Sequence, residues 1–353
     1  MKKLSVKVFG AGPSGSLLAI ALANSNTNVY LFDKIDKENL LSRDRSYAIT
    51  HSTRRLLQKL EIWSELENKI IPFYELSVLD SVINKSIVLS TKDLVTNNYK
   101  SKAVGWTIDH KLLMGVLFEK INKTNQINLQ LNCSKINDVL DYDYYFAADG
   151  ISSYYRKKWN IGTYSYRYSQ KCITFKALQR VNHTNRAYEI FRKEGPMAIL
   201  PMGKGLYQVI ISSPSALCDN FIKLPSSLFL DKVSTLLPSG LEIDSLYNNP
   251  EVFRLALSIS KKLILANKFL VGESSHSLHP VGGQGLNLSI RDINALTFLF
   301  NDSKNRNQIG LLSKRSKSLF IFKRYIDILS TSFLTHSLII IFSNSFTILR
   351  FIR

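Results

Sequence analysis

The order of apolar and polar positions divides the chain into two kinds of segment, and the first kind predicts buried strands and a helix. Residues 4–9 and 29–32 are short apolar runs, and the small, apolar residues 14–24 lie between them. This order predicts a strand, a closely packed helix and a second strand, which together open a parallel α/β sheet. Two further apolar runs, 142–148 and 263–271, predict buried strands far along the chain. We therefore expect an α/β fold whose sheet is assembled from distant parts of the sequence.

The second kind of segment lies between these runs. Residues 76–89 and 172–211 alternate β-forming with polar residues, which is typical of an antiparallel sheet with one exposed face. The prediction is a Rossmann-type domain with a mostly parallel sheet, interleaved with a smaller antiparallel-sheet domain and followed by a C-terminal helical segment. The predicted bounds are 1–75, 101–165 and 255–300 for the Rossmann-type domain, 76–100 and 166–254 for the antiparallel domain, and 301–353 for the helical segment.

The tail from residue 325 is rich in Ile, Leu and Phe, but Ser, Thr and His336 interrupt it. We expect an amphipathic helix rather than a membrane-spanning one. Its apolar residues fall near helical spacing and form one stripe: Ile328, Leu329, Phe333, Leu334, Leu338, Ile341, Phe342 and Phe346. Such a stripe more often packs on the body of a protein than on a membrane. Basic residues keep membrane contact as an alternative: Lys314, Arg315, Lys317, Lys323, Arg324, Arg350 and Arg353.

Composition and charge exclude several classes of protein. The 353 residues are 45% hydrophobic and 21% charged, which is ordinary for a globular chain. The net charge is +19, but Lys is spread along the chain without a basic and aromatic cluster, so we expect no nucleic-acid partner. The three cysteines form no Cys-x-x-Cys pair and fit a reducing, cytoplasmic compartment. His276 and His279 lack a third ligand at suitable spacing, so no metal site is predicted.

A glycine-rich loop between the first strand and the first helix carries the clearest chemical signal. Gly10 permits a tight turn, Gly12 lets a pyrophosphate approach the backbone, and Gly15 lets helix and strand pack closely. Pro13 and Ser14 complete the loop, and the helix start offers N–H groups to phosphates. Asp33 ends the second strand, where a carboxylate binds ribose hydroxyls and disfavours a 2′-phosphate. The loop predicts an adenine dinucleotide, either FAD or NAD, and not NADP.

A second segment, residues 269–292, separates FAD from NAD. A strand ends at a carboxylate, a glycine turn lets backbone approach something flat, and a helix begins near Gly285. A helix N-terminus stabilises negative charge, and reduced flavin carries such a charge on its ring. The predicted cofactor contacts here are Gly272, Glu273, Pro280, Gly283, Gln284, Gly285, Leu286 and Asn287. Asp149 and Gly150 end a third strand, and the three strand ends could meet at one ligand.

These segments resemble the ring hydroxylases of ubiquinone biosynthesis, within the flavoprotein aromatic hydroxylases that include para-hydroxybenzoate hydroxylase. The resemblance covers nearly the whole chain, and its most specific part is the His-x-x-His-Pro and Gly-Gln-Gly-Leu-Asn stretch. It also includes residues 44–49, 57–63, 147–150 with Ser153 and Arg156, and 191–201. One departure is Glu273, where the family usually has Asp, a side chain shorter by one methylene.

The resemblance implies an FAD-dependent monooxygenase that uses NAD(P)H and O2 to hydroxylate a polyprenylated phenol. The flavin would carry the chemistry, so no catalytic side chain is assigned. Arg45 would lie near the cofactor, Asp149 and Gly150 near the FAD pyrophosphate and the passing nicotinamide nucleotide, and Glu273 on the ribityl chain. The Rossmann-type domain would bind FAD and the antiparallel domain the substrate. A cytoplasmic enzyme on the inner face of the membrane, in a quinone-biosynthesis complex, fits this function.

Two other functions remain open at this point. The first is a non-catalytic accessory subunit that binds FAD or a lipid intermediate. Glu273 motivates it, and so does the part of the chain after Asp292, which is shorter than in the family that the chain resembles. The second is a related flavoenzyme such as a prenyl reductase; a halogenase is disfavoured because the chain has no Trp-x-Trp-x-Ile pattern. Asp44 and Arg45 could equally form a surface ion pair, and the 149–150 pair a simple turn.

Overall fold

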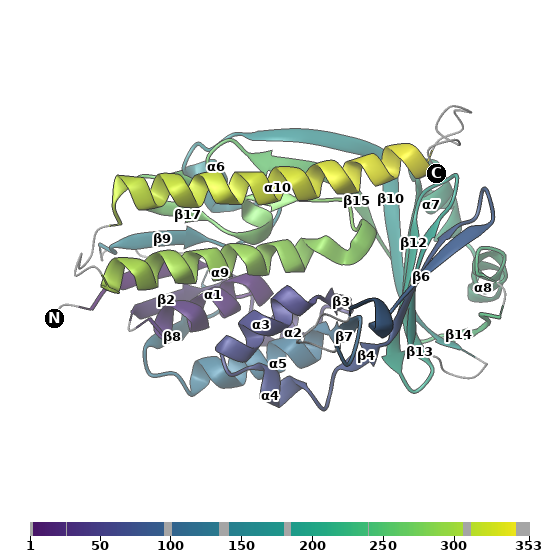
Figure 1. The fold of residues 1–353 in the computed structure, drawn as a ribbon, viewed down its shortest axis with the longest axis horizontal. Coiled ribbons are helices and arrows are strands. Elements are labelled where there is room, and N and C mark those ends of the chain that lie inside the picture. Colours follow the sequence, from purple (N-terminus) through teal and green to yellow (C-terminus); the bar gives the residue numbers. More distant parts are fainter. Residues whose placement is uncertain are drawn as a thin grey trace.

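The computed structural model describes residues 3–25, 27–94, 101–133, 141–179, 185–238, 240–305 and 312–343. Phe346, Arg350 and Arg353 of the predicted tail lie outside these ranges. The described chain forms a layered α/β body, a large antiparallel sheet beside it, and one long C-terminal helix that runs along the molecule (Figure 1). The predicted fold class is confirmed.

The first sheet has six strands in the order β16-β17-β9-β1-β2-β8. Its neighbouring strands pair in parallel, except for the antiparallel pair β16 and β17. The bounds are β1 Ser5–Phe9, β2 Asn28–Phe32, β8 Ile127–Gln130, β9 Tyr144–Ala147, β16 Ile264–Leu265 and β17 Lys268–Leu270. The prediction of one strand over 263–271 was wrong: Ala266 has a φ of 56° and turns the chain into a hairpin.

Helices cover this sheet and give it a continuous core. The central helix α1, Pro13–Ala23, is buried from Gly15 to Ala23 because it is apolar on every side. It packs against α5, His110–Asn122, and α9, Gln284–Asn305. Three short helices and a small sheet lie beside α5 and α9 (Figure 1): α2 Lys37–Leu41, α3 His51–Lys59 and α4 Trp63–Leu66, with β3 Ser46–Ile49, β7 Gly105–Asp109 and β4 Ile71–Phe73.

The large sheet runs in the order β18-β15-β10-β13-β12-β11-β5-β6, with β14 also paired to β10. Its strands pair antiparallel except β11 with β5. The bounds are β5 Glu75–Asp80, β6 Lys85–Ser90, β10 Thr163–Gln179, β11 Arg186–Phe191, β12 Met197–Gly203, β13 Leu206–Pro214, β14 Ile243–Leu246, β15 Glu251–Ser260 and β18 His276–Ser277. Two helices, α7 Ser215–Phe221 and α8 Ser226–Ser234, pack on this sheet through Cys218, Phe229 and Val233.

The strand β18 connects the two halves of the fold. It follows the short 3-10 turn η2, Gly272–Ser274, which comes directly after the first sheet, and it pairs with β15 of the large sheet. The segment predicted to contact flavin therefore lies where the two sheets meet. The domain bounds stay a prediction, although β15 and β18 belong to the large sheet, and part of β15 and all of β18 were assigned to the Rossmann-type domain.

The C-terminal helix α10, Lys314–Phe342, lies within the predicted helical segment 301–353 and packs against α9. By length and composition alone it could cross a membrane. The prediction of one stripe packed on the body was wrong, because the stripe divides between two faces. Ile328 is fully buried, whereas Leu329 and Phe333 are exposed. Arg324, predicted as part of a basic surface, is buried.

Candidate cofactor site

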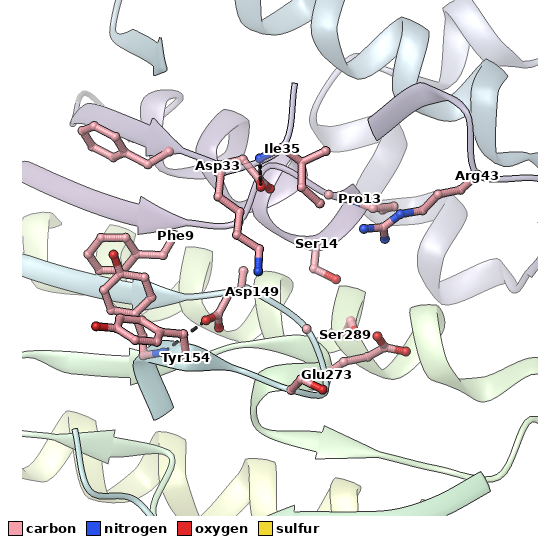
Figure 2. Close-up of a pocket in the computed structure, with 18 of the residues that line it drawn as sticks. Phe9, Pro13, Ser14, Asp33, Ile35, Arg43, Asp149, Tyr154, Glu273 and Ser289 are labelled. Atoms are coloured by element: carbon pink, nitrogen blue, oxygen red, sulfur yellow. Dashed lines mark hydrogen bonds between the residues drawn. The ribbon is translucent and has the colours of Figure 1, made fainter. Parts of the chain in front are cut away.

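A cavity of about 760 Å³ lies at the carboxyl ends of β1, β2 and β9 (Figure 2). The structure brings together there the three strand ends that the sequence singled out, with Asp33, Asp149 and Glu273 drawn from separate segments around it. The predicted residues that line the cavity are Gly10, Gly12, Pro13, Ser14, Asp33, Arg45, Asp149, Gly150, Glu273 and Leu286. The cavity is therefore built from distant parts of the chain.

The three glycines of the first loop differ in what surrounds them. A Cβ on Gly15 would lie 1.7 Å from the Gly10 carbonyl oxygen, and a Cβ on Gly10 would lie 2.4 Å from the Ala148 carbonyl oxygen. Gly15 is thus required by the packing of α1 on the loop, and Gly10 by the neighbouring chain at the end of β9 and by its own φ of 100°. A Cβ on Gly12 would meet nothing within 4 Å. The protein itself does not require glycine at position 12, which leaves a ligand as the reason for the small residue.

Helix α1 begins at the cavity wall, where Pro13 and Ser14 line the space. Its N-cap residue, Gly12, has no side chain to satisfy the first N–H groups of the helix. Such a helix start favours an anion, because its unpaired N–H groups and dipole both present positive charge. The arrangement suits the pyrophosphate of a dinucleotide.

Two carboxylates flank this loop. Asp33 accepts hydrogen bonds from the Ala11 N–H at 2.7 Å and the Ile35 N–H at 2.9 Å, and so holds the loops after β1 and β2 together. Asp149 accepts one bond from the Tyr155 N–H at 3.1 Å, while its Oδ1 atom is buried and has no partner within the described chain. Buried polar atoms are normally paired, so a ligand that donates a hydrogen bond to Asp149 fits the site.

Basic and aromatic side chains that sequence reasoning missed also line the cavity. Arg43, Lys34 and Lys158 join Arg45 there and supply positive charge toward a pyrophosphate. They are ordinary surface residues in the sequence, and no pattern of spacing marks them. Folding places them around one space because α2 and α6, Tyr154–Lys158, follow strand ends of the same sheet.

Tyr47 lines the cavity and forms a hydrogen bond with the buried His110. The imidazole Nε2 lies 2.7 Å from the Leu40 carbonyl oxygen and must donate a hydrogen bond to it. Nδ1 therefore accepts a hydrogen bond from the Tyr47 hydroxyl at 2.8 Å. Burial lowers the pKa of His110 and raises the pKa of Tyr47 to about 12. Both groups are therefore neutral at pH 7, and the tyrosine ring has a fixed orientation at the cavity wall.

A buried ionic network holds the turn that carries Glu273. Asp292 accepts hydrogen bonds from the Gly272 N–H at 2.9 Å, from His276 at 2.7 Å and from Arg324 at 2.8 Å. Burial alone would raise the pKa of Asp292, but the charges of His276 and Arg324 outweigh it and hold the pKa below its usual value. His276 is thus engaged with a carboxylate, and the turn is anchored to both α9 and α10.

The glycine turn before α9 lies next to the cavity but does not form part of its wall. Gly282 and Gly283 have φ values of 69° and 61°, which favour glycine, and a Cβ on Gly285 would meet nothing within 4 Å. Seven of the predicted cofactor contacts do not line the 760 Å³ cavity: Gly15, Gly272, Pro280, Gly283, Gln284, Gly285 and Asn287. The open surface at Gly285 matches close approach by a flat group.

Asn287 was predicted to contact the cofactor, yet its side chain is used within the protein. Its amide donates to the carbonyl oxygens of Ala48 and Gly283, both at 2.8 Å. Its oxygen accepts from the Thr53 hydroxyl at 2.7 Å and from the Thr50 N–H at 3.1 Å. The side chain joins the glycine turn to the segment that precedes α3, so its contribution to the site is to position that turn.

Glu189 is a further residue that the sequence did not indicate. It lies on β11, and its Oε2 accepts a hydrogen bond from the Gly282 N–H at 3.2 Å. Burial raises the pKa of Glu189 to about 8. The large sheet thus brings a carboxyl group with a raised pKa against the glycine turn. In the sequence, this residue is one polar position within an alternating strand.

Comparison with known proteins agrees with this geometry. The family model described as "FAD binding domain" matches residues 129–303. The chain is 25% identical over 316 residues to ubiquinone hydroxylase UbiL of Rhodospirillum rubrum, covering 84% of this chain and 72% of the relative. It is 23% identical over 375 residues to the mitochondrial ubiquinone biosynthesis monooxygenase COQ6 of Dictyostelium discoideum, covering 84% and 76%. The crystal structure of p-nitrophenol 4-monooxygenase PnpA from Pseudomonas putida DLL-E4 has a TM-score of 0.79 at 14% identity, covering 99% of this chain and 92% of that chain, and shows the shared fold.

Proposed function

Because the chain belongs to the FAD-dependent aromatic-ring hydroxylases, we propose that it hydroxylates a polyprenylated phenol in ubiquinone biosynthesis with NAD(P)H and O2. The observation that carries this proposal is the meeting of the glycine loop, Asp33, Asp149 and the Glu273 turn at one cavity. The names of the ubiquinone-biosynthesis relatives support the class of substrate. The accessory-subunit and prenyl-reductase alternatives are not favoured.

The residues of the cavity fit FAD, which is the cofactor of this family. The loop from Gly10 to Gly15 and the start of α1 would hold the pyrophosphate, with Arg45 nearby. Asp33 keeps acceptor capacity on both oxygens for the adenosine ribose, and the unpaired oxygen of Asp149 is available to a donor on the ligand. Glu273, exposed toward the cavity, would bind the ribityl chain.

Bound FAD supplies the redox chemistry, in which NAD(P)H provides the electrons and O2 the oxygen atom that the ring receives. The protein positions and shields the reactants. The start of α9 presents positive dipole charge beside the glycine turn, and Asn287 and Asp292 fix the segments on either side of it. We assign no catalytic side chain, since none need act as a nucleophile.

We also propose where the enzyme works. A polyprenylated phenol is held in a membrane, so a cytoplasmic enzyme must reach the inner face of that membrane to bind it. The exposed apolar side chains and the basic residues of α10 support peripheral contact through this helix. Membership of a quinone-biosynthesis complex is part of the same proposal, and co-purification with other quinone-pathway enzymes tests it.

The proposal is tested with purified protein and a short-chain polyprenylated phenol. We expect a yellow protein with bound FAD, NAD(P)H oxidation that depends on the phenol, and a product heavier by one oxygen atom. Deletion of the gene should lead to accumulation of the unhydroxylated phenol. Failure to bind added FAD would refute the assignment, and NAD(P)H oxidation that never yields a hydroxylated ring would refute the reaction.

A further inference from the structure

The solvent-facing side of α10 is apolar along about half of its length. Leu319, Phe322, Ile326, Leu329 and Phe333 follow one another at intervals of three or four residues and therefore share one helix face. Each is at least half exposed, and Phe333 is 75% exposed. We call these five residues the outer stripe. It is about 21 Å long, since an α-helix rises about 1.5 Å per residue. Figure 1 shows α10 running along the molecule, with α9 beside it.

The inner face of the same helix carries polar groups. Arg324 is 4% exposed and contacts Asp292, and Asp327 pairs with Arg291 at 2.8 Å. Ser332 and Thr335 are also buried. Phe320, Ile328 and Ile339 are buried on this face as well, so apolar residues lie on both the inner and the outer side of α10. A surface helix in a water-soluble protein normally keeps its outer side polar. An apolar surface of this size marks a region that contacts something other than water.

A basic cavity adjoins one end of the outer stripe. It has a volume of about 740 Å³ and lies among α1, α3, α9 and the start of α10. Lys59, Arg315 and Lys323 line it, and all three are exposed. No carboxylate is among its lining residues, and within the described chain none of the three cations forms an ion pair. Leu319 of the outer stripe and the exposed Phe298 also line it.

We propose that the outer stripe and this cavity bind the surface of an anionic phospholipid bilayer. The stripe would enter the boundary between headgroups and acyl chains, and the cavity would take the phosphate of one lipid headgroup. A long apolar face next to a cluster of cations is the combination that interfacial helices use. This inference rests on the proposed peripheral location and adds to it a defined surface and a headgroup site.

Charge favours a lipid over a second copy of the chain. A second copy would bring an identical surface, and the basic cavity of one copy would find no exposed carboxylate on the α10 face of the other, where Asp327 is the one acidic residue and is already paired. An anionic membrane offers phosphates to every cation along this edge. Each Lys or Arg near such a surface contributes about 1 kcal/mol of attraction.

The first experiment tests the apolar contact with the FAD-loaded protein. Flotation is measured with vesicles of phosphatidylcholine alone and with vesicles of equal parts phosphatidylcholine and phosphatidylglycerol. The double variant Leu319→Ser with Leu329→Ser should lose on the order of 100-fold in vesicle affinity, because two leucines no longer enter the bilayer. The control, Leu217→Ser with Leu228→Ser, removes two leucines of similar exposure from α7 and α8 and should bind as the wild type does.

The second experiment tests the basic cavity. Arg315→Glu with Lys323→Glu should weaken binding to the anionic vesicles by at least about 30-fold. Its binding to vesicles of phosphatidylcholine alone should differ little from that of the wild type. Lys223→Glu with Lys232→Glu makes the same charge change near α8 and should have a much smaller effect. Equal loss in both pairs would mean that net charge alone attracts the protein, and would overturn the headgroup site.

Two further readouts separate this inference from the proposed function. Bound FAD and turnover of a detergent-soluble phenol should be unchanged in all four variants, since none of these residues lines the cofactor cavity. Wild-type protein that turns over the phenol but never floats with anionic vesicles refutes the membrane surface and leaves the hydroxylase intact. If light scattering shows a dimer that the Leu319 and Leu329 changes convert to a monomer without altering flotation, the stripe is instead an interface between copies.

Discussion

The two glycines at positions 12 and 15 allow a sharp test of how the first loop works, because only one of them is required by the protein itself. In Gly15→Ala the new methyl group would lie 1.7 Å from the Gly10 carbonyl oxygen, whereas ordinary contact begins near 3.4 Å. The helix and the strand would have to separate by more than an ångström. Overpacking usually costs about 1–3 kcal/mol, and we expect the upper end of this range because the obstacle is backbone.

In Gly12→Ala the new methyl group meets nothing within 4 Å, and the backbone angles of φ −68° and ψ −175° suit alanine. The free energy of unfolding of the FAD-free variant should therefore lie within about 0.5 kcal/mol of the wild-type value. If a pyrophosphate approaches this backbone as proposed, the methyl group lies in its path. We expect a loss of about 1.4–2.8 kcal/mol in FAD binding, which is 10- to 100-fold in Kd.

Urea unfolding of the FAD-free proteins and FAD titration by flavin fluorescence measure the two effects separately. The expected pattern is a loss of stability in Gly15→Ala and a loss of FAD affinity without loss of stability in Gly12→Ala. Wild-type FAD affinity in Gly12→Ala would refute the placement of the pyrophosphate at this loop. Equal destabilisation by both changes would refute the assignment of separate roles.

Three other side chains provide further predictions. Asp292→Asn leaves the buried Arg324 without its main counter-charge and should lower the free energy of unfolding in urea by about 3–5 kcal/mol. Because the folded pKa of Asp292 lies below its usual value, this contribution is present near neutral pH and is lost as acid protonates the carboxylate. A wild-type stability that does not change with pH below about pH 4 contradicts this prediction. Tyr47→Phe leaves the buried Nδ1 of His110 without a donor, and denaturant melts should show a loss of about 1–3 kcal/mol; an unchanged melt would mean that water replaces the hydroxyl. The folded pKa of Glu189, near 8, lies above that of an unfolded carboxyl, so its stabilising effect is complete below about pH 4.5 and is lost as pH rises through 8. Glu189→Gln should therefore gain stability relative to the wild type between these values in melts followed against pH, and a difference independent of pH would contradict the prediction.

Much of the cofactor site was predictable because it depends on local geometry. Gly15 is required by its contact with the Gly10 carbonyl within one turn, Gly10 has a φ of 100°, and Asp33 bonds to the neighbouring loop. The spacing of residues in the sequence reveals such short-range patterns. The alternation of β-forming residues likewise predicted the large antiparallel sheet. The sequence by itself therefore determined the class of fold, the dinucleotide loop and the resemblance to a flavin enzyme.

The tertiary structure decided how distant residues meet. Arg43, Lys158 and Glu189 reach the site or its glycine turn through the order of strands in the sheets, which no spacing in the sequence reveals. It also decided which face of α10 points inward. Helical periodicity shows which residues share a face, but not which face is buried. Here the ion pair between Arg324 and Asp292 and the buried Ile328 hold one face of α10 against the body, and the apolar outer stripe is left on the surface.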